Sequence, residues 1–267
     1  MRRAALGLTC LLAGLAGCLS GPEPLGDLEL AWSDEFDGAA GTLPSAQNWG
    51  FDLGTDWGNA QLEYDTDRPE NAALDGQGNL LITARQENYQ GQPYTSARLT
   101  TRALREQRYG RFEARIKLPV SRGIWPAFWM LGADFPTVGW PASGEIDIME
   151  HFGREPGSIQ GALHGPNYSA GNSLYRRYDL PNGARFDTAF HVFAVEWSPD
   201  RINWFVDDSL YQSIKRSYPP GRWVFDKPFF LILNLAVGGG PAGAPDGSTT
   251  FPQVMTVDYV RVYRYKP

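Results

Sequence analysis

Apolar and polar positions alternate in short runs along most of the chain, and Gly, Pro, Asn and Asp separate the runs. Such alternation is typical of β-strands with one buried face, because successive side chains point to opposite sides. We expect strands near residues 79–84, 109–118, 190–197, 201–206, 229–235 and 255–265. A short turn separates 190–197 from 201–206, so these two segments predict a hairpin. The apolar run at 229–235 predicts a strand covered on both faces. No long stretch keeps a helical period, so the pattern predicts an all-β sandwich or jelly roll of roughly a dozen strands.

The N-terminal residues follow another pattern. A Met-Arg-Arg start precedes a short apolar run that ends in Leu-Ala-Gly-Cys18. A basic start before such a run is typical of a secretory signal, and its last four residues resemble a bacterial lipobox, in which cleavage precedes a lipidated cysteine. An ordinary signal peptide with an accidental cysteine is the alternative. We interpret the chain as a lipoprotein signal peptide (1–17), the lipidated Cys18 with a short Gly- and Pro-rich tether (18–27), and one domain (28–267).

Composition narrows the class of ligand. Lys and Arg number 24 against 30 Asp and Glu, and the formal net charge of −6 argues against a nucleic-acid partner. The 9 Trp, 12 Tyr and 14 Phe, together with 30 Gly, favour strands, turns and a flat uncharged ligand such as a sugar. Both cysteines, Cys10 and Cys18, precede the domain, so we expect no disulfide inside it. The three histidines lack the H-x-x-x-H spacing of a zinc site.

One predicted strand carries three carboxylates, in the order Glu145-Ile-Asp147-Ile-Met-Glu150. Alternation places Glu145 and Asp147 on one face, but strict alternation turns Glu150 away. A β-bulge at 148–149 adds one residue and returns Glu150 to the acidic face. Three carboxylates in a row repel one another and lose hydration, which is unfavourable unless a site uses them.

The spacing of the outer two carboxylates indicates a chemistry. With the bulge, Glu145 and Glu150 are about four strand steps apart, or about 13 Å between Cα atoms. Side chains that lean together reduce the carboxyl separation to about 5–6 Å, which matches a retaining glycosidase better than an inverting one. One glutamate then attacks the anomeric carbon and the other transfers the proton, while Asp147 orients the nucleophile. A solvated acidic face or a Ca²⁺ site is the alternative.

Trp125, Ala127 and Trp129 precede the acidic strand and stand two residues apart. A strand there places both indoles on one face. Flat indoles stack on sugar rings, and their nearness in sequence to the acidic strand favours that use. A buried tryptophan pair in the core is the alternative.

Four motifs together resemble glycoside hydrolase family 16, and in particular its bacterial endo-β-1,3-glucanases, the laminarinases. They are Trp57-Gly-Asn59, Trp125-Pro-Ala-Phe-Trp129, Glu145-Ile-Asp-Ile-Met-Glu150 and Ala162-Leu-His164-Gly-Pro. The resemblance extends over nearly all of 28–267 and implies that this is a catalytic domain. It implies a β-jelly roll of two curved antiparallel sheets with glucan in the concave cleft. It also implies Glu145 as nucleophile, Asp147 as its assisting acid and Glu150 as general acid/base; the inserted Met149 is similar to the laminarinase form rather than the lichenase form.

The same resemblance implies further site residues. The substrate-binding set is Asn59, Arg98, Trp125, Trp129, His164 and Asn234. It implies no cofactor for catalysis but a structural Ca²⁺ held by Glu35, the Gly78 carbonyl and Asp258, which are oxygen donors as Ca²⁺ requires. As alternatives, Arg98 is a surface cation, Asn59 a turn former, His164 a loop cap and Asn234 a satisfied buried amide. Likewise, Glu35 and Asp258 are ordinary turn and strand acids.

The sequence is therefore compatible with three functional hypotheses. The leading hypothesis is an exported, lipid-anchored, monomeric endo-β-1,3-glucanase, which meets a membrane only through its lipid and acts on a β-1,3-glucan such as laminarin. The second is a family relative that acts on mixed-linkage β-1,3-1,4-glucan or on a marine galactan. The third is a non-catalytic glucan-binding protein, against which the presence of all three carboxylates argues.

Overall fold

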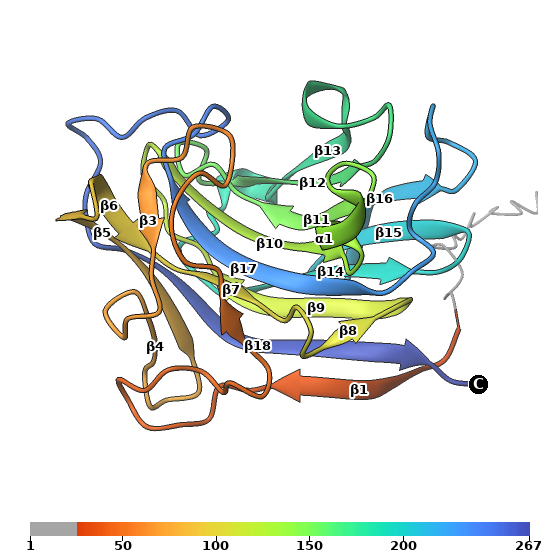
Figure 1. The fold of residues 1–267 in the computed structure, drawn as a ribbon, viewed down its shortest axis with the longest axis horizontal. Coiled ribbons are helices and arrows are strands. Elements are labelled where there is room, and N and C mark those ends of the chain that lie inside the picture. The colour runs from red at the N-terminus through yellow and green to blue at the C-terminus, as the bar shows by residue number, and fades with distance from the viewer. Residues whose placement is uncertain (1–25) are drawn as a thin grey trace, which may run out of the picture.

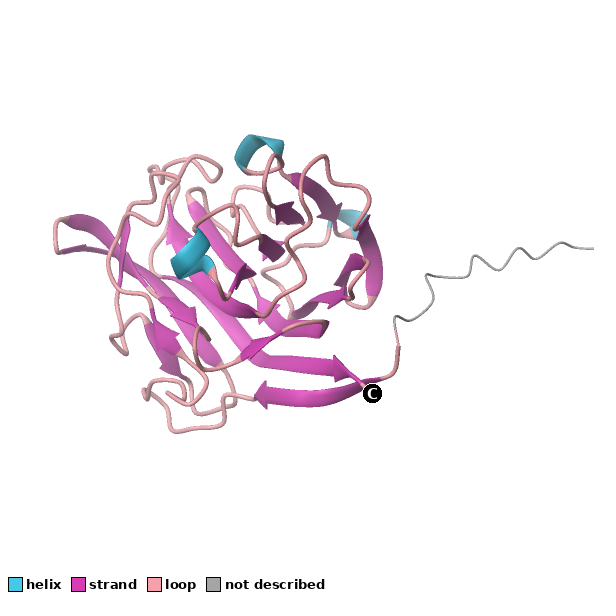
Figure 2. Cartoon of the chain, turned by 45° about the vertical axis from the view of Figure 1, so that its right-hand side comes forward, coloured by secondary structure: helices cyan, strands magenta, loops and turns pink. Residues whose placement is uncertain are grey.

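The computed structural model describes residues 26–267, so Cys18 and the predicted signal peptide lie outside the described residues. Two large sheets pack face to face, with helices confined to short connections (Figures 1 and 2). The helices are α1 (Phe135–Val138), η1 (Ala170–Asn172) and η2 (Pro181–Gly183). No helix in the described part of the chain is both long and apolar enough to span a membrane. The predicted all-β sandwich of two antiparallel sheets is confirmed.

One sheet has eight strands and the other has ten. The eight-stranded sheet runs β13 (Leu174–Asp179), β12 (Ser158–His164), β11 (Glu145–Glu150), β10 (Ile124–Gly132), β17 (Phe229–Val237), β7 (Arg98–Thr100) and β2 (Gly50–Phe51), with β8 (Glu106–Gln107) beside β17. The ten-stranded sheet runs β16 (Ser209–Lys215), β15 (Arg201–Val206), β14 (His191–Trp197), β9 (Gly110–Lys117), β18 (Gln253–Tyr265), β5 (Leu80–Tyr89), β6 (Gln92–Ser96) and β3 (Glu63–Asp65). In this second sheet β1 (Leu28–Asp34) pairs with β18, and β4 (Ala72–Leu74) pairs with β5. All pairs are antiparallel except the edge pair β3 and β6.

Local pattern predicts the long strands well and the short ones poorly. The expected hairpin is β14 and β15, which pair antiparallel, and β17 is buried along its whole length as its apolar run predicts. The estimate of about a dozen strands is too low, because the described residues form 18. Strands of two or three residues, such as β2 and β7, are too short to show a period.

The hydrophobic core lies between the two sheets. Phe128 and Met130 of β10 face Trp197 and Trp204 of the opposite sheet within one cluster of buried side chains. The outer face of the eight-stranded sheet is the one directed away from this core. It carries the residues that alternate with the core residues along the same strands. Because β10 and β17 run through the middle of this sheet, residues on their outer face lie at its centre (Figure 1).

Candidate active site

The β-bulge predicted in β11 is present. Met149 pairs with Phe128 and Asp147 pairs with Trp129, so Ile148 has no partner on β10. The register with β12 shifts at the same point. Ile148 and Met149 are both buried in the core, which an unbroken alternation does not allow. The bulge thereby returns the third carboxylate to the outer face; the three are Glu145, Asp147 and Glu150.

The opposite sheet supports the bulge from inside the core. A bulge interrupts the ladder of backbone hydrogen bonds, and a buried unpaired carbonyl is costly. Trp204 of β15 reaches across the core and donates its Nε1–H to the Asp147 carbonyl at 2.8 Å. The indole fits because position 161 on β12 is glycine, where a Cβ atom would lie 2.5 Å from Trp204 Cδ1. A residue without a side chain therefore makes room for the donor that holds β11.

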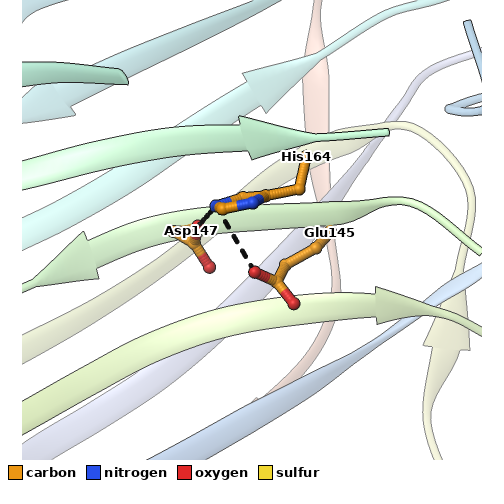
Figure 3. A group of neighbouring side chains, drawn as sticks. All are labelled: Glu145, Asp147 and His164. Carbon is orange, nitrogen blue, oxygen red and sulfur yellow. Dashed lines mark ion pairs between the residues drawn. The ribbon is translucent and has the colours of Figure 1, made fainter. Parts of the chain in front are cut away.

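His164 of β12 faces two of the carboxylates (Figure 3). Its Nε2 lies 3.0 Å from Asp147 Oδ2 and 3.5 Å from Glu145 Oε1, because Glu145 and His164 are direct cross-strand partners. Its Nδ1 accepts the backbone N–H of Ala170 at 3.2 Å. A neutral imidazole that accepts at Nδ1 carries its proton on Nε2, so the ring presents an N–H to the carboxylates.

Glu145, Asp147 and His164 also form a group with the composition of a metal site. One ligand atom from each lies within 4.8 Å of the others. A metal on Nε2 requires the proton on Nδ1, where ligating histidines normally donate a hydrogen bond. Here the Ala170 N–H occupies that direction, so the ring is arranged to donate to carboxylates and not to bind a metal ion.

Both carboxylate oxygens of Glu150 have N–H donors. Trp125 Nε1 donates to Oε1 at 3.1 Å, and Gln160 Nε2 donates to Oε2 at 2.9 Å. The two donors come from the strands on either side of β11, so the carboxylate is held from both flanks. Neither contact was predicted from the sequence, because each joins residues of different strands.

Burial raises the pKa of all three carboxyl groups. For Glu145, burial and the charge of Asp147 raise the pKa to about 8, against the opposing effect of His164 and Arg98. Burial and the charge of Glu150 raise the pKa of Asp147. For Glu150, burial raises the pKa, whereas the hydrogen bonds from Gln160 and Trp125 oppose the increase. Burial thus favours the protonated form of Glu150, which is the form that a general acid requires.

Arg98, Trp129 and Asn234 lie together on the same face. The guanidinium of Arg98 lies 4.8 Å from the ring centres of both Trp57 and Trp129, and Trp129 donates its Nε1–H to Asn234 Oδ1 at 2.8 Å. Arg98 is a buried cation paired with Asp52, not the exposed one of the alternative interpretation. Three predicted substrate-binding residues are thus linked by a cation–π contact and a hydrogen bond beside the carboxylates.

Trp125 and Asn59 have local contacts that the sequence did not predict, and their roles toward a substrate stay predictions. Trp125 is only 7% exposed, because it packs with Ala236, Ala242 and Phe152, so it offers little ring surface to a sugar. Its observed contact is the donor role toward Glu150. Asn59 is exposed in a turn with a φ of 56°, which asparagine tolerates well, and its carbonyl accepts the N–H of Gly240. The turn-forming interpretation therefore describes its backbone, and its role toward a substrate stays a prediction.

Two exposed aromatics that the sequence did not single out adjoin the carboxylates. The ring of Trp140 is 43% exposed and lies 6.0 Å from that of His164. Tyr175 of β13 is 62% exposed and pairs with Ala162, which in turn pairs with Asp147. Exposed rings beside the carboxylates offer flat apolar surfaces, so both are candidates for stacking on a sugar. Their signal in the sequence was weak, since each stands alone among polar residues or turns.

A second acidic group was also missed. Glu63 and Asp65 on β3 are 1% and 2% exposed, and Glu63 Oε2 accepts the backbone N–H of Val237 at 2.8 Å. Burial raises the pKa of Glu63 to about 7, and burial together with the charge of Glu63 raises that of Asp65. The alternation in the Glu-Tyr-Asp triplet, which places both acids on one face, is the sequence signal that could have identified this pair.

The predicted calcium residues meet near the end of β1. Asp34, the last residue of β1, pairs with Val260, so the next residue, Glu35, lies near Asp258 in register. A Cβ atom at Gly78 would lie 3.8 Å from the Glu35 carbonyl oxygen and within van der Waals distance of an Asp37 carboxylate oxygen. The three segments therefore do converge, with oxygen atoms around the glycine.

Ion pairs engage both predicted carboxylates. Arg261 binds the two oxygens of Glu35 at 3.0 and 2.8 Å, and Arg115 contacts Asp258 at 2.5 Å. The Glu35 carbonyl is consequently better placed as a ligand than its carboxylate. An oxygen-rich set of this kind fits Ca²⁺, provided that Asp258 exchanges its guanidinium partner for the ion.

Comparison with known proteins agrees with this geometry. Residues 55–261 match the family Glycosyl hydrolases family 16. A beta-glucanase of Rhodothermus marinus is 46% identical over 99% of this chain and 95% of its own length; a glucan endo-1,3-beta-glucosidase A1 of Niallia circulans is 35% identical over 89% of this chain and 38% of its own. The crystal structure of the laminarinase catalytic domain from Thermotoga maritima superposes with a TM-score of 0.85 at 45% identity, covering 90% of this chain and all of that one. The chain therefore belongs to glycosyl hydrolase family 16, as its four motifs predict.

Proposed function

We propose that this protein is a retaining endo-β-1,3-glucanase. The observation that carries the proposal is the bulged row of Glu145, Asp147 and Glu150 on the outer face, with an N–H donor on each oxygen of Glu150. The names of its relatives support β-1,3-glucan as the substrate, since one is a laminarinase and another a glucan endo-1,3-beta-glucosidase. Exposed rings at Trp140 and Tyr175 provide surfaces on which sugar rings stack.

In the first half-reaction a Glu145 carboxylate oxygen attacks the anomeric carbon. The glycosidic C–O bond breaks, and the proton of Glu150 passes to the leaving oxygen, so the reducing-end fragment departs as an alcohol. A covalent glycosyl ester on Glu145 remains. The His164 N–H faces Glu145 and Asp147 together and stabilises negative charge on the attacking side.

In the second half-reaction Glu150, now ionised, takes a proton from water. The resulting hydroxide equivalent attacks the anomeric carbon, the bond to Glu145 breaks, and the two inversions together retain the β-configuration. Glu150 must therefore be a competent acid first and a competent base second, at the same pH.

A panel of laminarin, lichenan, agarose and carrageenan tests the substrate, and proton NMR of the fresh reducing ends tests the stereochemistry. We expect fastest cleavage of laminarin into oligosaccharides whose new ends appear first as the β-anomer. No release from laminarin overturns the β-1,3-glucanase, and faster cleavage of another polymer reassigns the substrate. A first-formed α-anomer overturns the retaining mechanism.

We further propose that the protein is a monomer, exported and anchored through lipid on Cys18, with Ca²⁺ at the Glu35–Gly78–Asp258 site as a stabilising ion. The lipobox-like Leu-Ala-Gly-Cys18 supports the anchor, and the oxygen atoms around Gly78 support the ion. Mass spectrometry of Cys18 from native membranes tests the anchor. An unmodified thiol, or cleavage at another position, overturns it.

A further inference from the structure

One row of cross-strand partners crosses the outer face of the eight-stranded sheet and passes through Glu150. Glu150 of β11 pairs with Gln160 of β12, and Gln160 pairs with Arg177 of β13. Cross-strand partners present their side chains to the same face, so the half-buried amide of Gln160 stands between the carboxylate and the guanidinium. It contacts the carboxylate directly, with Nε2 at 2.9 Å from Oε2.

The two donors on Glu150 differ in what they can do. The indole N–H of Trp125 only donates, whereas the amide of Gln160 donates through its nitrogen and accepts through its oxygen. When Glu150 is ionised, both donors are satisfied. When Glu150 is protonated on Oε2, a half-turn of the Gln160 amide presents an acceptor to the new O–H. Gln160 thus has a good partner for either protonation state.

We propose that Gln160 is a positioning residue that balances the acid and base forms of Glu150 between the two half-reactions, an inference that rests on the proposed function. Burial disfavours charge on Glu150. A group that contacts the ionised form directly offsets this effect, and without it the base form becomes too scarce for the second half-reaction.

Other charged and titratable groups face Glu150 but do not replace this contact. They are Glu145 and Asp147 on β11, His164 on β12, Tyr211 on β16, and Glu155 and Arg177 around the small hollow beside Gln160. The charge of Glu150 raises the pKa of Glu145 and of Asp147, and His164 favours the ionised form of Glu150. The charge of Arg177 is engaged by Glu155 and Asp179.

The test measures kcat/KM on laminarin against pH for wild type, Gln160→Leu, Gln160→Glu and the control Gln253→Leu. Gln253, at the start of β18 in the other sheet, also donates through Nε2, but to Thr250 in the preceding loop. Loss of one donor to a charged acceptor raises the alkaline limb by about one pH unit in Gln160→Leu. Gln160→Glu raises it further, because a second carboxylate faces Glu150. The control keeps the wild-type profile.

An alkaline limb that stays in place in both Gln160 variants, or moves down, overturns the inference. Gln160→Met, with a similar volume and no donor, repeats the measurement if the leucine variant does not fold. The carboxyl ¹³C resonance of Glu150, titrated in Glu145→Gln with and without Gln160→Leu, gives the same answer without turnover. A protein that fails on laminarin but still shows the titration shift overturns the proposed function and keeps the coupling between Gln160 and Glu150.

Discussion

Within residues 26–267, one group of carboxylates with raised pKa values opens to the surface and a second is sealed from it. The β11 carboxylates are Glu145, Asp147 and Glu150, and the β3 carboxylates are Glu63 and Asp65. In both groups burial raises the pKa, and in both the members also repel one another. A raised pKa alone therefore does not distinguish the catalytic carboxylates from the structural ones.

Their partners and their exposure separate them. Glu63 accepts a backbone N–H from Val237 and is sealed from solvent, so it ties β3 to the end of β17. The β11 carboxylates contact donors on side chains, and the Glu145 side chain keeps 16% of its surface exposed. A perturbed pKa marks a buried acid, and access for a substrate together with adjustable partners marks a catalytic one.

The largest expected effect distinguishes the two groups by activity. Glu145→Gln removes the nucleophile, so we expect kcat on laminarin to fall on the order of 10⁴-fold or more. Glu63→Gln keeps an acceptor for Val237 and contacts no substrate, so we expect its kcat to stay within about threefold of wild type. Comparable losses in the two variants would contradict the distinction.

The pH dependence of stability measures the contribution of Glu63 in the β3 group. The pKa of Glu63 rises from 4.5 to about 7 on folding, so between these values the folded state binds more protons than the unfolded state. The free energy of unfolding consequently falls as pH increases through this range, by about 3 kcal/mol for this group. Glu63→Gln lacks this contribution, whereas the β11 carboxyl groups, whose pKa values are also raised, contribute in both proteins. Urea unfolding at about pH 5 and about pH 8 measures it, and an equal decrease in the variant shows that another group is responsible.

Arg98 connects the two groups, which predicts a mixed effect. Its guanidinium binds Asp52 on the side of β3 and stacks on Trp129 on the side of β11. Arg98→Lys keeps the charge but loses the planar contacts, so we expect about 1–2 kcal/mol lower stability and a several-fold higher KM. Arg102→Lys is the matched control, because Arg102 binds the other oxygen of Asp52 from a more exposed position. A change in stability without any change in KM separates Arg98 from the substrate.

The smallest effect concerns a third set of acids, next to β1. Millimolar Ca²⁺ should raise Tm by about 2–4 °C through preferential binding to the folded state, and Mg²⁺ should not. Asp258→Asn should abolish the increment while catalysis by β11 persists. Because the increment is compared within each variant, the lost contact with Arg115 does not enter it. An unchanged Tm in wild type contradicts the calcium site.

The sequence predicts features that lie within one strand, but it does not predict contacts between residues that are far apart in the chain. The Glu-Ile-Asp-Ile-Met-Glu pattern is sufficient to predict both the shared face and the bulge, because alternation and its interruption are properties of one strand. The partners that complete the site come from elsewhere. Trp204 is 57 residues from Asp147 in sequence, and Val237 is 174 residues from Glu63. Trp125 lies on the predicted face, but how far its neighbours cover it depends on loops whose packing no local period encodes.

The bulge at Ile148 reverses which positions of β11 face outward. From Gly144 to Asp147 the odd positions face outward, and after the bulge the even ones do, beginning with Glu150. A single deletion of Met149 removes the shift and leaves the glutamate facing outward, whereas a single insertion or deletion between Glu145 and Asp147 sends one of those acids into the core. We therefore expect a change of length in this strand to be tolerated at Met149 and disruptive between Glu145 and Asp147.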